Sequence, residues 1–68
     1  MKPVTGKETC EALERRGWIL RRIKGAHHIY NRPGAARPIP VPVHGNRLLA
    51  TGTQRAIMRA AGLTGADL

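Results

Sequence analysis

Two adjacent histidines are the residues of this sequence best suited to chemistry. His27 and His28 lie in the stretch KGAHHIYN, directly after a glycine and an alanine. The unperturbed pKa of imidazole is about 6.5, so a histidine here could act as a general base or as a metal ligand near neutral pH. A histidine in a short strand is more often structural, and the surrounding residues must decide between these roles.

A metal site is not predicted. Neighbouring residues of a strand point to opposite faces, so His27 and His28 are poorly placed to share one ion. His44, next to a glycine, is expected to be a hydrogen-bonded structural residue. The single cysteine, Cys10, offers none of the paired spacings of a zinc site. We therefore expect no metal and no other cofactor.

The distribution of charge indicates a polyanionic partner. The chain holds 12 Lys and Arg against four Asp and Glu, a net charge of +8. Three of the acids come before Arg15, and the next is Asp67. An ordinary solvated surface mixes both signs, so the long stretch without a carboxylate should create a positive field. Nucleic acid is the commonest polyanion, and a membrane surface is less favoured because the sequence shows no basic amphipathic helix with an aromatic face.

RNA is a substrate that this combination of residues could cleave. A histidine base could remove the proton of a ribose 2′-hydroxyl, and nearby cations could stabilise the added negative charge on phosphorus. Arg21, Arg22 and Lys24 lead directly into the histidine turn and are the best candidates for phosphate contact. His28 and Tyr30 share a strand face, where RNA contact and simple packing are alternatives. The acid for the leaving 5′-oxygen stays open between His28, Tyr30, Lys24 and solvent.

The elements that must position these groups begin with a helix over about residues 6–16. Thr5 and Glu8 fit a capping box, in which each side chain accepts a hydrogen bond from the other residue's backbone N–H. Gly17 is expected to end the helix in a left-handed conformation. Trp18 is expected in the core, because the chain has no phenylalanine to fill it.

Three strands are predicted next. The runs WILRRIK and HHIYNR flank a glycine and predict a hairpin. In RPIPVPVHG, prolines and β-branched residues alternate from Pro38 to Val43. The prolines then remove backbone donors from one edge only, so this strand should lie at the edge of the sheet, with Ile39, Val41 and Val43 facing the core.

A second helix completes the order. Thr53 is its expected N-cap, and Gly62 with Leu63 its C-terminal motif. Its expected apolar stripe consists of Ala56, Ile57, Ala60 and Ala61. The 68 residues thus predict one α+β domain over residues 1–68, of α-β-β-β-α order, with a three-stranded antiparallel sheet and both helices on one face.

Three stretches of the sequence resemble the HicA family of toxins from bacterial and archaeal toxin–antitoxin pairs. They are TGKETCEALERRGW, KGAHHIY and VPVHGNRLLATGTQRAIMRAAGL, in the family's order and spacing. The resemblance implies a fold like that of double-stranded-RNA-binding domains, cleavage of mRNA and neutralisation by a HicB antitoxin. It also implies that the histidine of a Gly-Ser-His motif is catalytic. By position that histidine is His27, but Ala26 stands where the motif has serine.

Residues and resemblance together predict a type II toxin that cleaves single-stranded mRNA and inhibits translation. The expected enzyme is a metal-independent RNA endonuclease with His27 as general base; a non-catalytic RNA-binding module of the same fold is the alternative. Direct DNA binding is expected only through the antitoxin. No stretch approaches the roughly 20 apolar residues that span a bilayer, and the first residues contain no hydrophobic signal region. We therefore expect a cytoplasmic protein.

Overall fold

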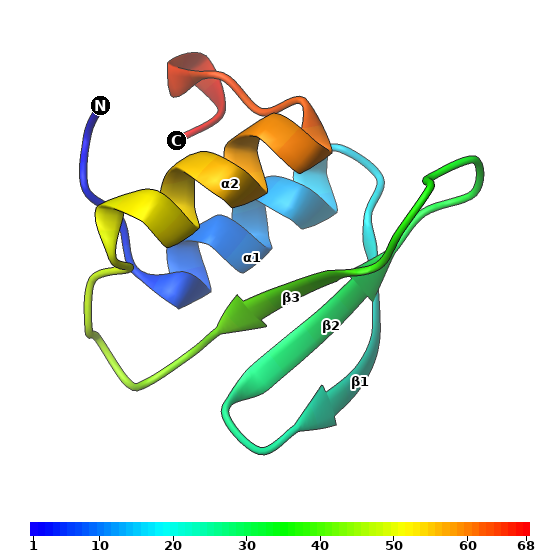
Figure 1. Ribbon diagram of the computed structural model, residues 1–68, viewed down its shortest axis with the longest axis horizontal. Helices are drawn as coiled ribbons and strands as arrows, with labels where there is room; N and C mark the ends of the chain where they lie inside the picture. The colour runs from blue at the N-terminus through cyan, green and yellow to red at the C-terminus, as the bar shows by residue number, and fades with distance from the viewer.

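Two helices and three strands build the fold in the predicted order α-β-β-β-α. The computed structural model describes residues 1–68. Its elements are α1 (Gly6–Arg15), β1 (Ile19–Lys24), β2 (His27–Asn31), β3 (Ile39–Pro42), α2 (Thr51–Ala61) and a short 3₁₀ helix, Gly65–Asp67. The strands form one antiparallel sheet of order β1-β2-β3, and both helices lie on the same side of it (Figure 1). This confirms the predicted α+β fold. Neither helix has the length and apolar content that a membrane span requires.

The first helix begins with the predicted capping box. The Thr5 hydroxyl accepts a hydrogen bond from the Glu8 backbone N–H at 3.1 Å, and the Glu8 carboxylate accepts one from the Thr5 N–H at 2.9 Å. The hydrogen bond from the Thr5 backbone N–H, with a smaller contribution from the Thr5 hydroxyl, holds the pKa of the Glu8 carboxyl below its usual value. After the helix, Gly17 has a φ of +87°, the left-handed conformation expected there.

The second helix begins earlier than predicted. Its N-cap is Ala50, which provides no side-chain hydrogen bond, and Thr53 lies inside the first turn. The reason is a contact distant in sequence: the Leu49 N–H donates to the Val4 carbonyl at 2.8 Å, which fixes the extended segment up to Leu49. The helix can then start directly afterwards, without the hydroxyl cap that the sequence offered at Thr53.

The buried face of α2 also differs from the predicted stripe. Ile57 and Ala61 are buried as expected, but Ala56 and Ala60 are exposed, and Gln54 is buried in their place. The Gln54 side chain is retained in the interior because it is hydrogen-bonded: its amide donates to the Lys2 carbonyl at 2.6 Å and its oxygen accepts from the Val4 N–H at 3.3 Å. The C-terminal motif is confirmed, since the N–H of the residue after Gly62, Leu63, donates to the Met58 carbonyl at 2.9 Å.

The hydrophobic core lies between the sheet and the helices. Leu13 from α1 and Ile57 from α2 pack with Tyr30, Ile39 and Val41 from the sheet. Trp18 is also buried in this cluster, as predicted, and the Arg32 guanidinium lies 4.7 Å from the centre of its ring.

The proline-containing strand is an edge strand, as predicted. β3 pairs only with β2, with Val41 opposite His28 and Ile39 opposite Tyr30. The Val43 N–H continues the pairing by donating to the Ala26 carbonyl at 2.7 Å. The prolines alternate with these residues, so their missing N–H groups fall on the open edge of the sheet.

Candidate active site

A tight hairpin turn positions His27. Lys24 and His27 are directly paired, so β1 and β2 are joined by the two residues Gly25 and Ala26. Gly25 has a φ of +58°, whereas Ala26, like every other non-glycine residue, has a negative φ. A positive φ at the first turn residue only is typical of a type II′ turn, which favours glycine there. The turn projects away from the helices (Figure 1). His27, the first residue of β2, is consequently exposed.

The strand register places two cations on the same face as His27. Residues that are directly opposite share a face, and successive residues alternate. Lys24 lies opposite His27, and Arg22 lies opposite Ile29, two residues further along β2. Tyr30, which is buried against the helices, marks the other face. His27, Lys24 and Arg22 therefore share the helix-free face of the sheet, which we call the open face.

His28 and Tyr30 lie on the face that the helices cover. His28 pairs with Ile23 on one side and Val41 on the other, and its side chain is half-buried. The Tyr30 side chain is 1% exposed, and its hydroxyl donates to the Glu14 carboxylate at 2.5 Å. Burial and this hydrogen bond raise the pKa of the Tyr30 phenol above its usual value. The expectation that Tyr30 contacts RNA is therefore corrected, because its ring belongs to the core.

Tyr30→Phe should lower the free energy of unfolding by about 1–2 kcal/mol, the usual cost of losing a hydrogen bond to a carboxylate that can return to water. Urea denaturation measures this loss. The affinity for single-stranded RNA should not change, because the hydroxyl points to Glu14 on α1 and not to the open face. A large loss of RNA affinity at unchanged stability would contradict this assignment.

Three cations beside the histidine turn have no partner within the chain. The register slips between Leu20 and Arg22, which leaves Arg21 in a β-bulge. Arg21, Arg22 and Lys24 are all exposed. None of them forms an ion pair or a side-chain hydrogen bond. Their positive charge is free for a ligand.

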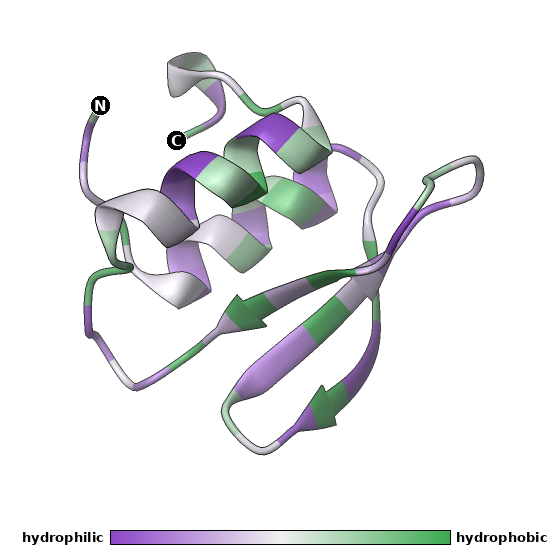
Figure 2. Cartoon of the chain, in the orientation of Figure 1, coloured by the Kyte–Doolittle hydropathy of each residue, from purple (hydrophilic) through white to green (hydrophobic).

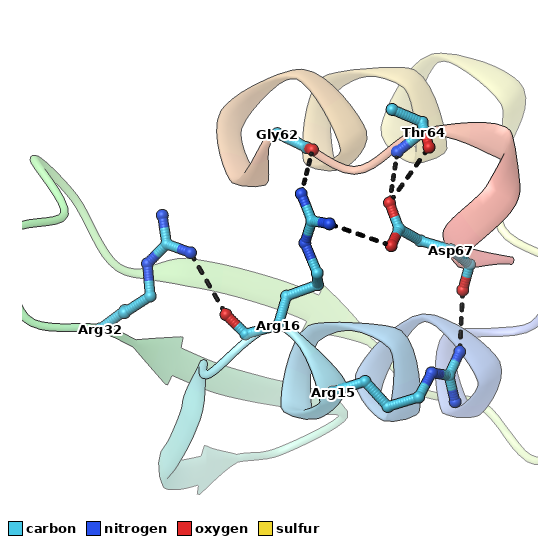
Figure 3. A network of polar contacts seen from close by, with 6 residues as sticks. All are labelled: Arg15, Arg16, Arg32, Gly62, Thr64 and Asp67. Atoms are coloured by element: carbon cyan, nitrogen blue, oxygen red, sulfur yellow. Dashed lines mark hydrogen bonds and ion pairs between the residues drawn. The ribbon is translucent and has the colours of Figure 1, made fainter.

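Another group of arginines is already used to fasten the C-terminal segment (Figure 3). Arg15 donates to the Asp67 carbonyl at 2.8 Å, and Arg16 forms an ion pair with the Asp67 carboxylate at 3.5 Å. Arg16 also donates to the Gly62 carbonyl at 3.3 Å. Arg32 in turn donates to the Arg16 carbonyl at 3.3 Å. Arg15, Arg16 and Arg32 thus have a structural role in addition to the positive charge that they contribute.

No carboxylate lies on the sheet. Glu8, Glu11 and Glu14 belong to α1, and Asp67 belongs to the C-terminal 3₁₀ helix. The open face consequently holds cations without any acid to balance them. An anionic ligand at His27 would meet positive charge from β1 and no repulsion from the sheet.

The remaining candidates do not add to this site. His44 is exposed and its side chain makes no hydrogen bond, so the expected hydrogen-bonded structural role is wrong. No three side chains among the histidines, cysteine and acids come together as a metal-ligand set. Trp18 and Tyr30, the only tryptophan and tyrosine, are both buried, so the open face has no large aromatic side chain on which a base could stack.

Two apolar residues that lie beside His27 on the open face were not predicted. Ile29 shares the face with His27, and Pro42 of β3 lies directly opposite His27. Strand alternation alone could have identified Ile29. Pro42 could not be identified in the same way, because its place depends on the register between β2 and β3, which a long loop separates.

Comparison with known families agrees with the features described above. A family model described as the HicA toxin of bacterial toxin-antitoxin matches residues 6–63. The matched range runs from the first residue of α1 to just beyond α2 and includes the whole histidine hairpin. A search of curated proteins finds no match. Because the family model covers most of the 68 residues, the chain belongs to the HicA toxin family of bacterial toxin–antitoxin systems.

Proposed function

We propose that this toxin is a ribonuclease that cleaves single-stranded mRNA in the cytoplasm and thereby inhibits translation. His27 is the general base, and no metal ion takes part. The observation that carries the proposal is the exposed position of His27 on an open face where Lys24 and Arg22 share its side of the sheet and no carboxylate does. A base and an excess of positive charge are what cleavage by a ribose hydroxyl requires.

The reaction needs one proton acceptor, a negatively charged transition state and one proton donor. His27 takes the proton of the 2′-hydroxyl, the 2′-oxygen bonds to phosphorus, and the bond between phosphorus and the 5′-oxygen breaks. The products are a 2′,3′-cyclic phosphate and a 5′-hydroxyl. Among the candidate proton donors, Lys24 and water fit best, since Lys24 faces the same side as His27, whereas Tyr30 is buried and His28 faces the helices.

Recognition of RNA in this proposal rests on the backbone. Arg22 and Lys24 bind phosphates on the open face, and Arg21 adds charge from the bulge. Each such contact should steepen the dependence of log affinity on log salt by about 0.7 for a single strand. A single strand is the better substrate because its flexible backbone can place the 2′-oxygen in line with the leaving 5′-oxygen.

A cognate antitoxin of the HicB type is the proposed protein partner. It would cover the open face and neutralise its charge, and it would supply any DNA binding of the pair. The unbalanced charge of +8 supports a partner with acidic groups.

Incubation of end-labelled RNA with the purified protein in the presence of a chelator tests the proposal. We expect cleavage products that end in a 2′,3′-cyclic phosphate. A DNA oligonucleotide of the same sequence is the matched control: it should bind but stay intact, because it has no 2′-hydroxyl. RNA binding without any cleavage would favour the non-catalytic module, and cleavage that the chelator abolishes would overturn the metal-free mechanism.

A further inference from the structure

The two edges of the sheet differ in their ability to accept another strand. On β3, Pro40 and Pro42 remove backbone donors from the free edge. β1 contains no proline, and no other element covers its outer side, so its backbone groups stay available. In Figure 1, β1 lies at the border of the sheet opposite β3. Only one edge of this sheet is therefore protected against strand addition.

The available edge also carries most of the exposed large apolar side chains of the protein. Leu20 is 39% exposed and Ile23 57% exposed, and every residue of β1 is exposed. Their partners on β2, Tyr30 and His28, place Leu20 and Ile23 on the helix-covered face of the sheet. The helices do not extend far enough to bury these two side chains. A strand beside β1 would give them the neighbours they lack.

The register identifies the backbone groups that such a strand would meet. Ala26 of the turn accepts a hydrogen bond from Val43, the residue directly after β3. The backbone groups of the next residue, His27, are therefore directed toward β1. Its partner Lys24 therefore bonds to β2, and so does Arg22 two residues earlier. Ile23, between them, directs its N–H and C=O to the free edge.

The positive charge of β1 indicates what kind of strand could pair with its free edge. Arg21, Arg22 and Lys24 lie within this strand, and it contains no acid. Two copies of β1 would repel each other when paired, because like charges on adjacent strands are destabilising. An acidic strand would instead gain from the same cations. From Arg22 to Lys24 two cations flank the apolar Ile23, and the strand register puts the cations and Ile23 on opposite faces of the sheet. The hairpin accordingly shows both hydrophilic and hydrophobic positions in Figure 2. A segment that alternates acidic and apolar residues fits this part of β1.

We propose that β1 binds an extended, acidic segment of a protein partner as a fourth strand of the sheet. The apolar side chains of the segment contact Leu20 and Ile23, and its carboxylates contact Arg22 and Lys24 on the opposite face. Its backbone pairs with Ile23. Because Arg22 and Lys24 are also the proposed phosphate contacts, the segment would compete with RNA, but its binding to β1 does not depend on that proposal.

Fluorescence anisotropy with a labelled peptide tests the proposal. The probe is as long as β1, alternates Glu with Val or Ile, and has blocked ends. Ile23→Pro removes a backbone N–H from the free edge of β1, as the prolines of β3 do on the other edge. It should weaken peptide binding at least about tenfold, the loss expected for about 1.4 kcal/mol of backbone pairing. Ile23→Val, which keeps the N–H, should bind like the original protein. A peptide of the same composition with its glutamates grouped at one end should also bind about tenfold more weakly.

N-methylated peptides test the same pairing without altering the protein. One peptide is methylated at the amides of its apolar residues, and the other at the amides of its glutamates. Only one of the two should bind, because alternate amides of a strand face opposite edges. If the two methylated peptides bound equally well, or if the peptide with grouped glutamates bound as tightly as the alternating one, charge alone would attract the probe. Either result would overturn the proposal. The proposal would also be overturned if the free protein dimerised and Ile23→Pro abolished the dimer, because the free edge of β1 would then bind a second copy of this chain.

Discussion

Replacing His27 by alanine should slow RNA cleavage by about 10²–10⁴-fold, the contribution of a positioned general base. The chain has no substitute for this imidazole on the open face, because His28 faces the helices and Lys24 is a cation that cannot accept a proton. The rate is measured in single turnover with excess protein, so that a change in RNA affinity does not affect it.

The same variant should still bind RNA. Arg21, Arg22 and Lys24 remain, so the affinity of His27→Ala for an uncleavable DNA or RNA analogue should stay within about threefold. The exposed position of His27 makes a change in unfolding free energy above about 0.5 kcal/mol unexpected. His44→Ala is the matched control, since it removes an exposed imidazole outside the hairpin. Cleavage by His27→Ala at the original rate, or its loss in His44→Ala, would contradict the assignment.

Local patterns were sufficient to predict the elements of the fold. The capping box of α1 involves two residues three positions apart, Thr5 and Glu8, and both of its hydrogen bonds are present. The alternation of proline and β-branched residues identified β3 as an edge strand, because strand geometry has a period of two. The position of His27 on an exposed turn followed from a glycine and the hairpin pattern. Each of these signals lies within a few consecutive residues.

Features that depend on contacts distant in sequence could not be predicted. Tyr30 offered RNA contact and packing as alternatives until α1 was seen to supply Glu14 for its hydroxyl. The start of α2 moved to Thr51 because Leu49 is bonded to Val4, near the other end of the chain. The exposure of β1 depends on how far the helices extend over the sheet. In each case the sequence contained the residues but not the register that brings them together.

Nothing in the sequence singled out Gly6, yet it lies at a close backbone contact between α1 and the end of β3. It is the first residue of α1, and it is buried against the end of β3. A Cβ placed on Gly6 would overlap the Pro42 carbonyl oxygen. It would also lie 3.0 Å from the Pro42 carbonyl carbon and 3.1 Å from the Val43 Cα. All three neighbours are backbone atoms, so no side-chain rotation can relieve the overlap.

Gly6→Ala should therefore lower the free energy of unfolding by about 3 kcal/mol, a large part of the stability of so small a domain. Gly52→Ala is the matched control, because Gly52 also lies in the first turn of a helix and a Cβ there has no neighbour within 4 Å. That substitution should be neutral or should stabilise the protein by up to about 1 kcal/mol, through the higher helix propensity of alanine. Urea denaturation of the two variants measures the difference, and equal stabilities would show that the α1–β3 contact is looser than described.

The effect of Gly6→Ala should also reach the candidate active site. Pro42, which the new methyl group would displace, is the residue directly opposite His27 on the open face. Under conditions where the variant is still folded, its single-turnover cleavage should be slower than that of Gly52→Ala, because a displacement of about 1 Å at a catalytic group can cost about a hundredfold in rate. Cleavage at the original rate by folded Gly6→Ala would mean that β3 can move without moving the base, and the position of His27 would then depend on the β1–β2 hairpin alone.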